Sequence, residues 1–261
     1  MRIFIITMDD PVQTKQFIRR IIDARYKDIV GIAVPKGNRL TLSKGKSKYE
    51  YLFSLFLIMG FYHFFKNAFI SILHKFKKIL HSMGLCPDPT ILGYAKIKGI
   101  ATFKIETPNN LEFLEKLKKL NPDIIINQSQ NILKKELLEI PTIGVINRHN
   151  ALLPKNRGRL SPFWVLYKGE KETGVSIHFV EEALDSGDII VQEKYPVTEK
   201  DNFNTLVKKN YQLAPKAMLM AIDLLENGYK DFIPNNDNQA TYNTTPTLKE
   251  AWQYRKRRIF R

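Results

Sequence analysis

The chain has 261 residues, 44% of them hydrophobic, which is enough for one sizeable domain with a packed core and an appendage. A formal net charge of +15 favours anionic partners such as nucleotide-linked substrates, nucleic acid or acidic lipid. A lysine-rich composition with solvated faces explains that charge equally well. Cys86 is the only cysteine, which excludes an intrachain disulfide and indicates a reducing compartment.

The N-terminal run MRIFIITMDD has the pattern of a first strand and lacks the cleavage site of a signal peptide. We therefore expect a cytoplasmic protein, with peripheral contact with a membrane as the alternative. No aromatic-plus-basic motif typical of nucleic-acid binding is present, so nucleic acid is not an expected partner.

Runs of β-branched residues alternate with helical patterns along the chain. The predicted strands are residues 2–7, 28–34, 102–105, 123–127, 144–149, 175–180 and 189–195. The predicted helices are residues 13–24, 90–98, 110–120, 131–138 and 203–226. This alternation implies a mainly parallel sheet covered by helices on both faces. No Gly-x-Gly-x-x-Gly motif follows the first strand, so the sheet does not imply a dinucleotide.

Residues 36–85 interrupt this alternation. Between Tyr51 and Leu73 only Lys66 carries a formal charge, and the uncharged run is short for a membrane-spanning helix, although the wider window keeps that option open. We predict two helices over residues 50–81, or one helix bent at Gly60. Their apolar face should pack on the domain or on a second subunit, and contact with a membrane through the flanking lysines is the second interpretation.

Asn147 and His149 stand two residues apart at the end of an apolar run, so on a strand both side chains point to the same face. Asp185 follows in a turn between two further strand-like runs. An amide, an imidazole and a carboxylate at the edge of a sheet suit a reaction that builds and collapses a tetrahedral oxyanion. A core histidine capped by a loop aspartate would be the first interpretation of an isolated pair.

Residues 143–197 resemble the catalytic core of the folate-dependent formyltransferases, which include sugar N-formyltransferases and methionyl-tRNA formyltransferases. The matching motifs are Asn147-Arg148-His149, Leu152-Leu153-Pro154, Arg157-Gly158 and Asp185-Ser186-Gly187. Four elements in the same order form a strong signal. Weaker agreement extends to Met1–Pro11 and to a Tyr-x-x-x-Pro-Thr stretch that begins at Tyr242.

This resemblance implies transfer of a formyl group from 10-formyltetrahydrofolate to a primary amine through a tetrahedral intermediate, without a metal. Asn147 would hold the oxyanion through its side-chain amide. His149 would donate to the oxyanion or relay protons, and Asp185 would orient the imidazole and favour its protonated form.

The resemblance also implies a folate site and a loop beside the amine. The expected cofactor-binding residues are Gln128, Gln130, Asn131, Leu133, Leu184 and Asp185. The expected substrate-loop residues are Leu153, Pro154, Arg157 and Gly158, with a cis bond between Leu153 and Pro154. An ordinary turn with a solvated arginine is an equally good interpretation of Arg157.

The other histidines look non-catalytic and no metal site is expected. The histidines outside the motif are His63, His74, His81 and His178, of which the first three fall in the insert and the last on a strand. Together with a single cysteine they fit no zinc-ligand spacing.

The predicted fold class is α/β: a Rossmann-like, mainly parallel sheet with helices on both faces, a helical insert after the second strand and a short C-terminal extension. We assign residues 1–200 to a formyltransferase catalytic domain, with the insert at residues 36–85. Residues 201–261 are assigned to a C-terminal helix and basic extension.

The expected acceptor is a small-molecule amine of an amino sugar or nucleotide-linked sugar. A methionyl-tRNA formyltransferase-like enzyme is the alternative, disfavoured by the short stretch after Gly228 because that family usually adds a C-terminal barrel. A glycinamide ribonucleotide enzyme and a non-catalytic membrane-associated binding protein remain open. So do a homodimer and peripheral membrane contact through residues 50–81.

Overall fold

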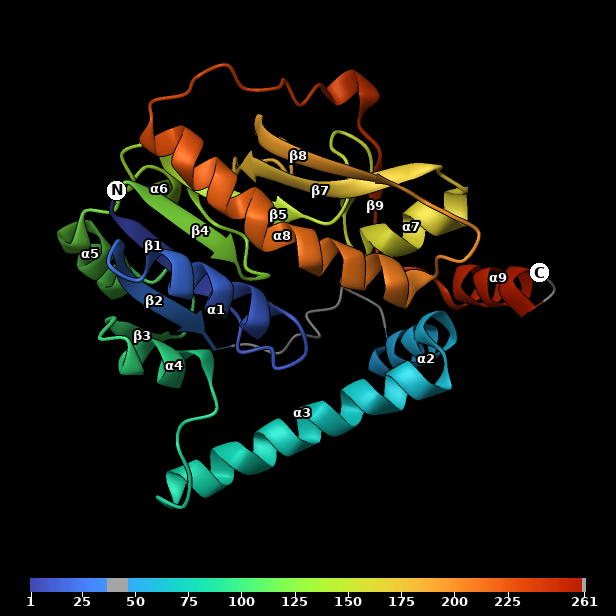
Figure 1. Ribbon diagram of the computed structural model, residues 1–261, viewed down its shortest axis with the longest axis horizontal. Helices are drawn as coiled ribbons and strands as arrows, with labels where there is room; N and C mark the ends of the chain where they lie inside the picture. The colour runs from blue at the N-terminus through green and yellow to red at the C-terminus, as the bar shows by residue number, and fades with distance from the viewer. Residues whose placement is uncertain (37–46, 260–261) are drawn as a thin grey trace.

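The computed structural model describes residues 1–36 and 47–259 of the chain. Within that part, a seven-stranded sheet with the order β3-β2-β1-β4-β5-β7-β8 forms the centre (Figure 1). Its strands are β1 Ile3–Thr7, β2 Ile29–Pro35, β3 Thr102–Ile105, β4 Ile124–Gln128, β5 Gly144–His149, β7 Glu172–Phe179 and β8 Ile189–Pro196. The short strands β6 Arg157–Gly158 and β9 Tyr242–Asn243 form a separate pair.

The helices connect and cover these strands. They are α1 Thr14–Arg25, α2 Lys48–Met59, α3 Phe61–Ser82, α4 Ile91–Ile97, α5 Leu111–Leu120, α6 Lys135–Leu138, α7 Ser161–Lys168, α8 Phe203–Glu226 and α9 Leu248–Ile259. Strands β1 to β5 pair in parallel, whereas β7 is antiparallel to β5 and β8 is antiparallel to β7. The predicted α/β fold with a mainly parallel sheet is therefore confirmed.

Alternation along the strands divides the core into two layers. Ile3 and Ile5 of β1 face one side, where they pack with residues of α1, α4 and α8. Phe4 and Ile6 face the other side, where they pack with residues of α5 and α6. In Figure 1, α1 and α8 cross in front of the sheet. Because both faces are covered, the central strands are apolar throughout, as parallel strands usually are.

The predicted strands and most predicted helices agree with the structure to within three residues at each end. The helix expected at 131–138 is an exception, because only Lys135–Leu138 is helical. Before it, the Asn127 Oδ1 accepts hydrogen bonds from the Ser129 backbone N–H and hydroxyl. The Ser129 hydroxyl oxygen in turn accepts one from the Asn131 backbone N–H. Such local side-chain bonds compete with helix formation and keep residues 129–131 in a turn.

Helix α8 joins the main core rather than standing apart from it. Its residues Ala214, Met218 and Ile222 are fully buried in the same layer as the central strands β1 and β4. The division of the chain at residue 200 stays a prediction, and the packing of α8 shows that residues after it contribute to the core.

The insert forms two helices that meet at Gly60, as predicted. Gly60 has φ +77°, which is unfavourable for other residues, and it ends α2 and begins α3. Helix α2 buries Leu57 and Ile58 in a cluster with Phe163 and Tyr254. The part of the insert at residues 37–46 lies outside the described residues.

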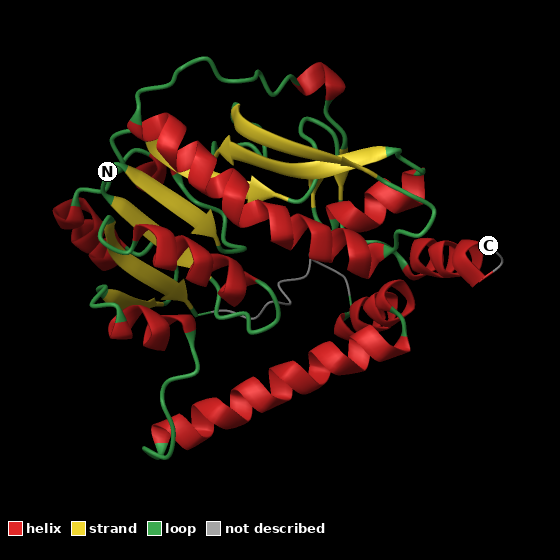
Figure 2. Cartoon of the chain, in the orientation of Figure 1, coloured by secondary structure: helices red, strands yellow, loops and turns green. Residues whose placement is uncertain are grey.

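Helix α3 differs from our expectation. Its apolar face is not covered by the domain: Phe61, Phe69 and Ile72 are 68%, 66% and 65% exposed. In Figure 2, α3 is the long helix that runs along one side of the molecule, away from the sheet. Of the two covers that we expected, the protein's own domain does not hide this face, because His74 and Lys78 turn the polar side of the helix to the domain. Packing on a second subunit stays a prediction. Among the described helices, none combines the length and the apolar character needed to cross a membrane.

Candidate active site

Asn147 and His149 lie at the carboxyl end of β5, on the face of the sheet that also carries Val145. Across the antiparallel pairing, Asn147 stands opposite His178 and His149 stands opposite Ser176. All four side chains therefore share one face, since directly paired residues point to the same side. This brings the two predicted catalytic residues of β5 next to two polar residues of β7.

His149 is buried, and each of its ring nitrogens faces oxygen. Its Nδ1 lies 3.5 Å from the Asp185 Oδ2. Its Nε2 lies 2.7 Å from the Asn156 backbone oxygen and 3.1 Å from the Ser161 hydroxyl. A carbonyl oxygen only accepts, so the short contact with Asn156 places a proton on Nε2. The predicted proximity of His149 and Asp185 is present in the structure.

Asp185 reaches His149 because its loop folds back over the strands. The residue has φ +50°, an unusual value for an aspartate, and its Oδ2 accepts a 2.8 Å hydrogen bond from the Gly158 backbone N–H. Asn235 donates from its side chain to the Asp185 and Gly187 backbone oxygens. The C-terminal segment thus holds the turn in place.

The pKa of Asp185 is lowered from its ordinary value. Burial on its own would raise this pKa, but the charges of His149 and His178, the Gly158 N–H and the charge of Arg157 together outweigh burial. The carboxylate is consequently ionised at neutral pH, as a group that orients an imidazole must be.

His178 is a site residue that sequence reasoning missed. It is 1% exposed, its Nε2 lies 3.7 Å from the Asp185 Oδ1, and burial lowers its pKa to about 4. The His178 Nδ1 donates to the Phe179 backbone oxygen, and Nε2 has no hydrogen-bond partner within residues 1–36 and 47–259. Asp185 thus lies between two imidazoles. The sequence alone gave no signal for this residue, because its place in the site depends on the antiparallel register between the distant strands β5 and β7, which sets His178 directly opposite Asn147.

A chain of side-chain hydrogen bonds orients Asn147. Gln128 donates from Nε2 to the Asn147 Oδ1 at 2.7 Å, and the Gln128 Oε1 accepts from the Arg148 Nε at 3.0 Å. Arg148 is itself clamped between the rings of Tyr211 and Phe17. The amide oxygen of Asn147 is therefore occupied, whereas no acceptor for its Nδ2 is found in the described part of the chain.

The other predicted cofactor-binding residues lie in different surroundings. Gln130 and Asn131 are exposed in the turn after β4, and Leu184 is 60% exposed. Leu133 is buried in the core layer that contains α5. Of the six predicted residues, Gln128 bonds Asn147 and Asp185 faces His149, and the other four make no hydrogen bond or ion pair with either residue.

The loop after β5 is fixed by backbone contacts and has the predicted cis bond between Leu153 and Pro154. The Leu153 N–H donates to the Ser176 hydroxyl, and its carbonyl accepts from the Gln192 side chain at 2.8 Å. Ser176 also donates to the Ala151 backbone oxygen. Strands β7 and β8 therefore hold the loop beside His149.

Arg157 is fully buried, which excludes the interpretation of a solvated arginine in an ordinary turn. Its guanidinium donates to the Asp237 carboxylate, the Tyr242 hydroxyl and both the backbone and side-chain oxygens of Asn235. The side chain thus connects the substrate loop to the C-terminal segment.

Gly158, the next residue, has φ +97°, and a Cβ there would lie 2.2 Å from the Asn243 backbone oxygen. Only glycine allows β6 and β9 to pair this closely. The Arg157-Gly158 motif is thus explained by packing against the C-terminal segment.

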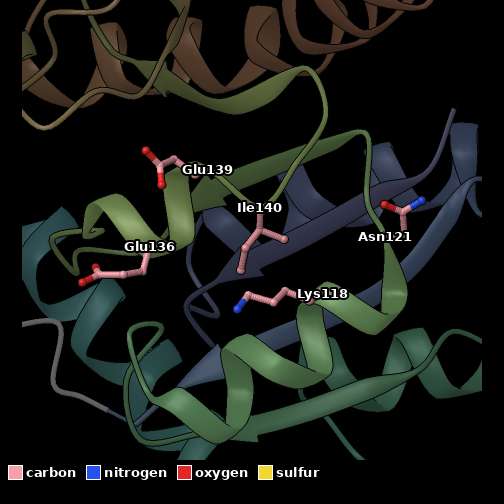
Figure 3. A pocket seen from close by; sticks show the side chains of 5 residues that line it. All are labelled: Lys118, Asn121, Glu136, Glu139 and Ile140. Carbon is pink, nitrogen blue, oxygen red and sulfur yellow. The ribbon is translucent and has the colours of Figure 1, made fainter.

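The surface has two hollows that His149 does not line. The larger one has a volume of about 530 Å³ and lies between the end of α5 and α6 (Figure 3). It is lined by Lys118, Asn121, Glu136, Glu139 and Ile140. The other, of about 310 Å³, is lined by Leu152, Lys155, Glu170, Lys171 and Glu172. The predicted folate pocket near residues 128–133 is neither of them and stays a prediction.

Within residues 1–36 and 47–259, no three His, Cys, Asp or Glu side chains gather in a way that could hold a metal ion. The groups next to the Asp185 carboxylate are the imidazoles of His149 and His178 and the Gly158 backbone N–H. This group resembles an arrangement for moving protons more than a set of metal ligands.

Comparison with known proteins identifies the family. The model of the formyl transferase family matches residues 88–222, just over half of the chain. A methionyl-tRNA formyltransferase from Kosmotoga olearia is 38% identical over 159 residues, which cover 60% of this chain and 51% of the relative. The chain spans about half the length of the curated relatives it matches.

Solved structures support the same fold. A phosphoribosylglycinamide formyltransferase from Anaplasma phagocytophilum has a TM-score of 0.60 at 15% identity, covering 93% of this chain and 98% of that protein. The N-formyltransferase from Helicobacter canadensis, solved with folinic acid and dTDP-3-aminofucose, has a TM-score of 0.57 at 17% identity over 94% of this chain and 71% of that protein. With the matched residues 88–222 including Asn147, His149 and Asp185, the chain belongs to the formyl transferase family.

Proposed function

We propose that the protein is an N-formyltransferase that uses 10-formyltetrahydrofolate as the formyl donor and a primary amine as the acceptor. The observation that carries this proposal is the group formed by Asn147, His149 and Asp185 at the end of β5, with Nδ1 of the imidazole 3.5 Å from the carboxylate. Membership of the formyl transferase family supports the same reaction.

Each residue of this group has a chemical role in the proposed reaction. The bond from Gln128 occupies the Asn147 Oδ1, and residues 1–36 and 47–259 provide no acceptor for its Nδ2. That Nδ2 donates to the oxyanion that develops when the amine attacks the formyl carbon. His149 takes the proton of the attacking amine on Nδ1, because its Nε2 already carries the proton donated to the Asn156 carbonyl oxygen, and it returns a proton to the departing nitrogen. Asp185 holds the ring in orientation and stabilises the imidazolium that forms.

The residues around the site fit a folate-type donor. The bound donor supplies an activated formyl group and a nitrogen leaving group. The turn after β4 leaves Ile132 83% exposed, and the Asp185 turn leaves Leu184 60% exposed. Small-molecule sites are lined mostly by apolar side chains with a few polar groups, and both turns offer such a mixture.

For the acceptor we propose an amine of an amino sugar or nucleotide-linked sugar, in a cytoplasmic enzyme. The likeness to the Helicobacter canadensis N-formyltransferase, whose structure holds dTDP-3-aminofucose, extends over 94% of this chain. A second candidate is methionyl-tRNA. It is favoured by the curated relatives of that name, with 38% and 41% identity, whose matches cover 60% and 54% of this chain.

The test is an assay of tetrahydrofolate release from 10-formyltetrahydrofolate with a panel of amines. The panel contains dTDP- and UDP-linked amino sugars, glycinamide ribonucleotide and methionyl-tRNA, each with the wild-type protein and the His149→Asn variant. Release that depends on one amine and on His149 supports formyl transfer and identifies the acceptor class. Binding of the donor without release with any amine would contradict catalysis and favour a binding protein.

A further inference from the structure

Helix α3 carries a continuous apolar stripe that faces solvent. Nine large apolar side chains recur at intervals of three or four residues, the spacing of one helix face. They are Phe61, Tyr62, Phe65, Phe69, Ile72, Leu73, Phe76, Ile79 and, just after the helix, Met83, each between 40% and 68% exposed. A stripe of this length is far larger than the scattered apolar residues found on most surfaces.

The orientation of α3 is fixed by polar contacts on its opposite side. His74 is buried and its Nε2 lies 3.0 Å from the Asp9 carboxylate, just after β1. The Lys78 amine donates to the same carboxylate at 3.0 Å. Just before α3, at the end of α2, the Asn204 side chain donates to the Met59 backbone oxygen at 2.8 Å. These bonds hold the polar side against the domain, so the apolar stripe is turned outward.

Aromatic contacts extend the stripe onto α2. Phe56 packs against Phe64 and Phe65 with ring centroids 5.6 and 6.4 Å apart. Phe53, which is 51% exposed, stacks on Phe56 at 6.1 Å. The two helices therefore present one apolar surface, which we call the α2–α3 surface, made of Phe53, the eight α3 residues named above and Met83.

Lysines border this surface on both sides. At 100° per residue, Lys66 and Lys77 fall along one edge of the stripe and Lys75 along the other, and all three are exposed. No Asp or Glu occurs between Tyr51 and Pro87. The basic helix α9 lies beside the insert. Its Arg255 guanidinium packs against Gly60, so closely that a Cβ added to Gly60 would lie 3.2 Å from it.

We propose that the α2–α3 surface docks the protein on a membrane that contains anionic lipids. The aromatic stripe would enter the boundary between headgroups and acyl chains, and the lysines at its edges would contact anionic headgroups. At 22 residues, α3 is about 33 Å long and would lie in the plane of the interface. The polar contacts of His74 and Lys78 with Asp9 keep the domain on the opposite side of the helix.

The charge pattern favours lipid over a second copy of the chain. Two copies that paired through this surface would bring the lysine edges together, and the insert offers no carboxylate between Tyr51 and Pro87 to neutralise them. Like charges in contact oppose association, whereas anionic headgroups complement both edges at once.

The test is flotation of the full chain with two kinds of vesicle. One kind is phosphatidylcholine alone, and the other contains about one third phosphatidylglycerol. We expect binding to the anionic vesicles that weakens as salt increases, and at least about tenfold weaker binding to the neutral ones, since each lysine near an anionic surface contributes about 1 kcal/mol.

Two variants and their controls assign the binding to this surface. Phe65→Glu with Phe69→Glu should reduce the bound fraction at least tenfold, whereas Leu111→Glu with Met220→Glu, two exposed apolar positions on α5 and α8, should leave it unchanged. Lys66→Gln, Lys75→Gln and Lys77→Gln together should reduce it about tenfold or more. The charge-matched control is Lys119→Gln, Lys208→Gln and Lys230→Gln.

Three results would overturn the proposal. The first is no binding of the folded wild-type protein to anionic vesicles, and the second is equal loss of binding in the α2–α3 variant and its control. The third is a concentration-dependent dimer in sedimentation that the Phe65→Glu, Phe69→Glu variant abolishes, because it would assign the surface to a second copy. The readouts require no formyl transfer, so they are independent of the proposed reaction.

Discussion

The candidate active site buries polar side chains, whereas the α2–α3 surface exposes apolar ones. Around Asp185 the chain buries polar groups and satisfies most of them internally: Arg157 is fully buried and makes four hydrogen bonds. On α3 the chain exposes apolar groups, with Phe69 66% exposed, and buries the polar His74. Buried polar groups that are bonded need nothing further, whereas an exposed apolar stripe costs free energy until something covers it.

Substitutions in these two regions should therefore have different effects on the isolated protein. Changes at the site should alter the isolated protein, its catalysis, its stability or its response to pH. Changes on the α2–α3 surface should leave the isolated protein almost unaltered.

Replacing His149 by Asn should lower formyl transfer by about 10²- to 10⁴-fold, the usual contribution of a general acid or base. The stability should change little, because Asn can still bond Asn156 or Ser161, both of which contact the His149 Nε2. The measurement is kcat/KM with the acceptor found in the amine panel, accompanied by the melting temperature. His63→Asn on α3 is the matched control and should retain full activity.

Replacing Arg157 by Met should lower the free energy of unfolding by about 2–4 kcal/mol. The loss comes from the oxygens of Asn235 and Tyr242 that lose their donor. The bond to Asp237 adds little, because that carboxylate is 79% exposed and well solvated. Denaturation with urea measures the change, and Arg20→Met on the exposed side of α1 is the control. Equal stability of the two variants would contradict a supporting role for Arg157.

Burial of His178 predicts a loss of stability in mild acid. Its pKa is about 4 in the folded chain against an ordinary 6.5, so below pH 6.5 the unfolded chain takes up a proton that the folded chain refuses until about pH 4. Stability should therefore fall as the pH drops from 6.5 to 4, by on the order of 3 kcal/mol.

Unfolding by urea across this pH range checks the prediction, and His178→Asn should flatten the slope while His63→Asn should not. The lowered pKa of Asp185 acts in a different window. Its stabilising contribution is present above its ordinary value of 3.8 and is lost only as the pH falls through its lower folded pKa. A slope that persists in His178→Asn would assign the acid sensitivity to another group.

The helices and strands that could be predicted from the sequence are those defined by a local hydrophobic pattern. The central strands are short apolar runs between turns, and β5 and α8 have the predicted bounds because a β-branched run and a strong amphipathic period define them. Helix α7 was missed, although Pro162 near its start and Gly169 in the left-handed region at its end were available signals.

The sequence predicted which residues form the site, but only some of the contacts between them. Asn147, His149 and Asp185 follow from a motif, but the burial of Arg157 and the position of His178 depend on pairings between distant segments, such as β6 with β9. The outward face of α3 could not be predicted either. An apolar stripe in a sequence does not show which side of the helix the fold will anchor, and the anchor here is a contact of His74 with Asp9, 65 positions away.

The smallest expected effect is that of Phe69→Ser in the isolated protein. Phe69 is 66% exposed, so the substitution should change the free energy of unfolding by no more than about 0.5 kcal/mol. Leu57 of the same insert is 6% exposed in the cluster with Phe163 and Tyr254, and Leu57→Ala should cost about 2–4 kcal/mol. Unfolding with urea in the absence of lipid compares the two. Losses of similar size would mean that Phe69 is covered in solution, and the α2–α3 surface would then be an internal contact of the protein rather than one that awaits a partner.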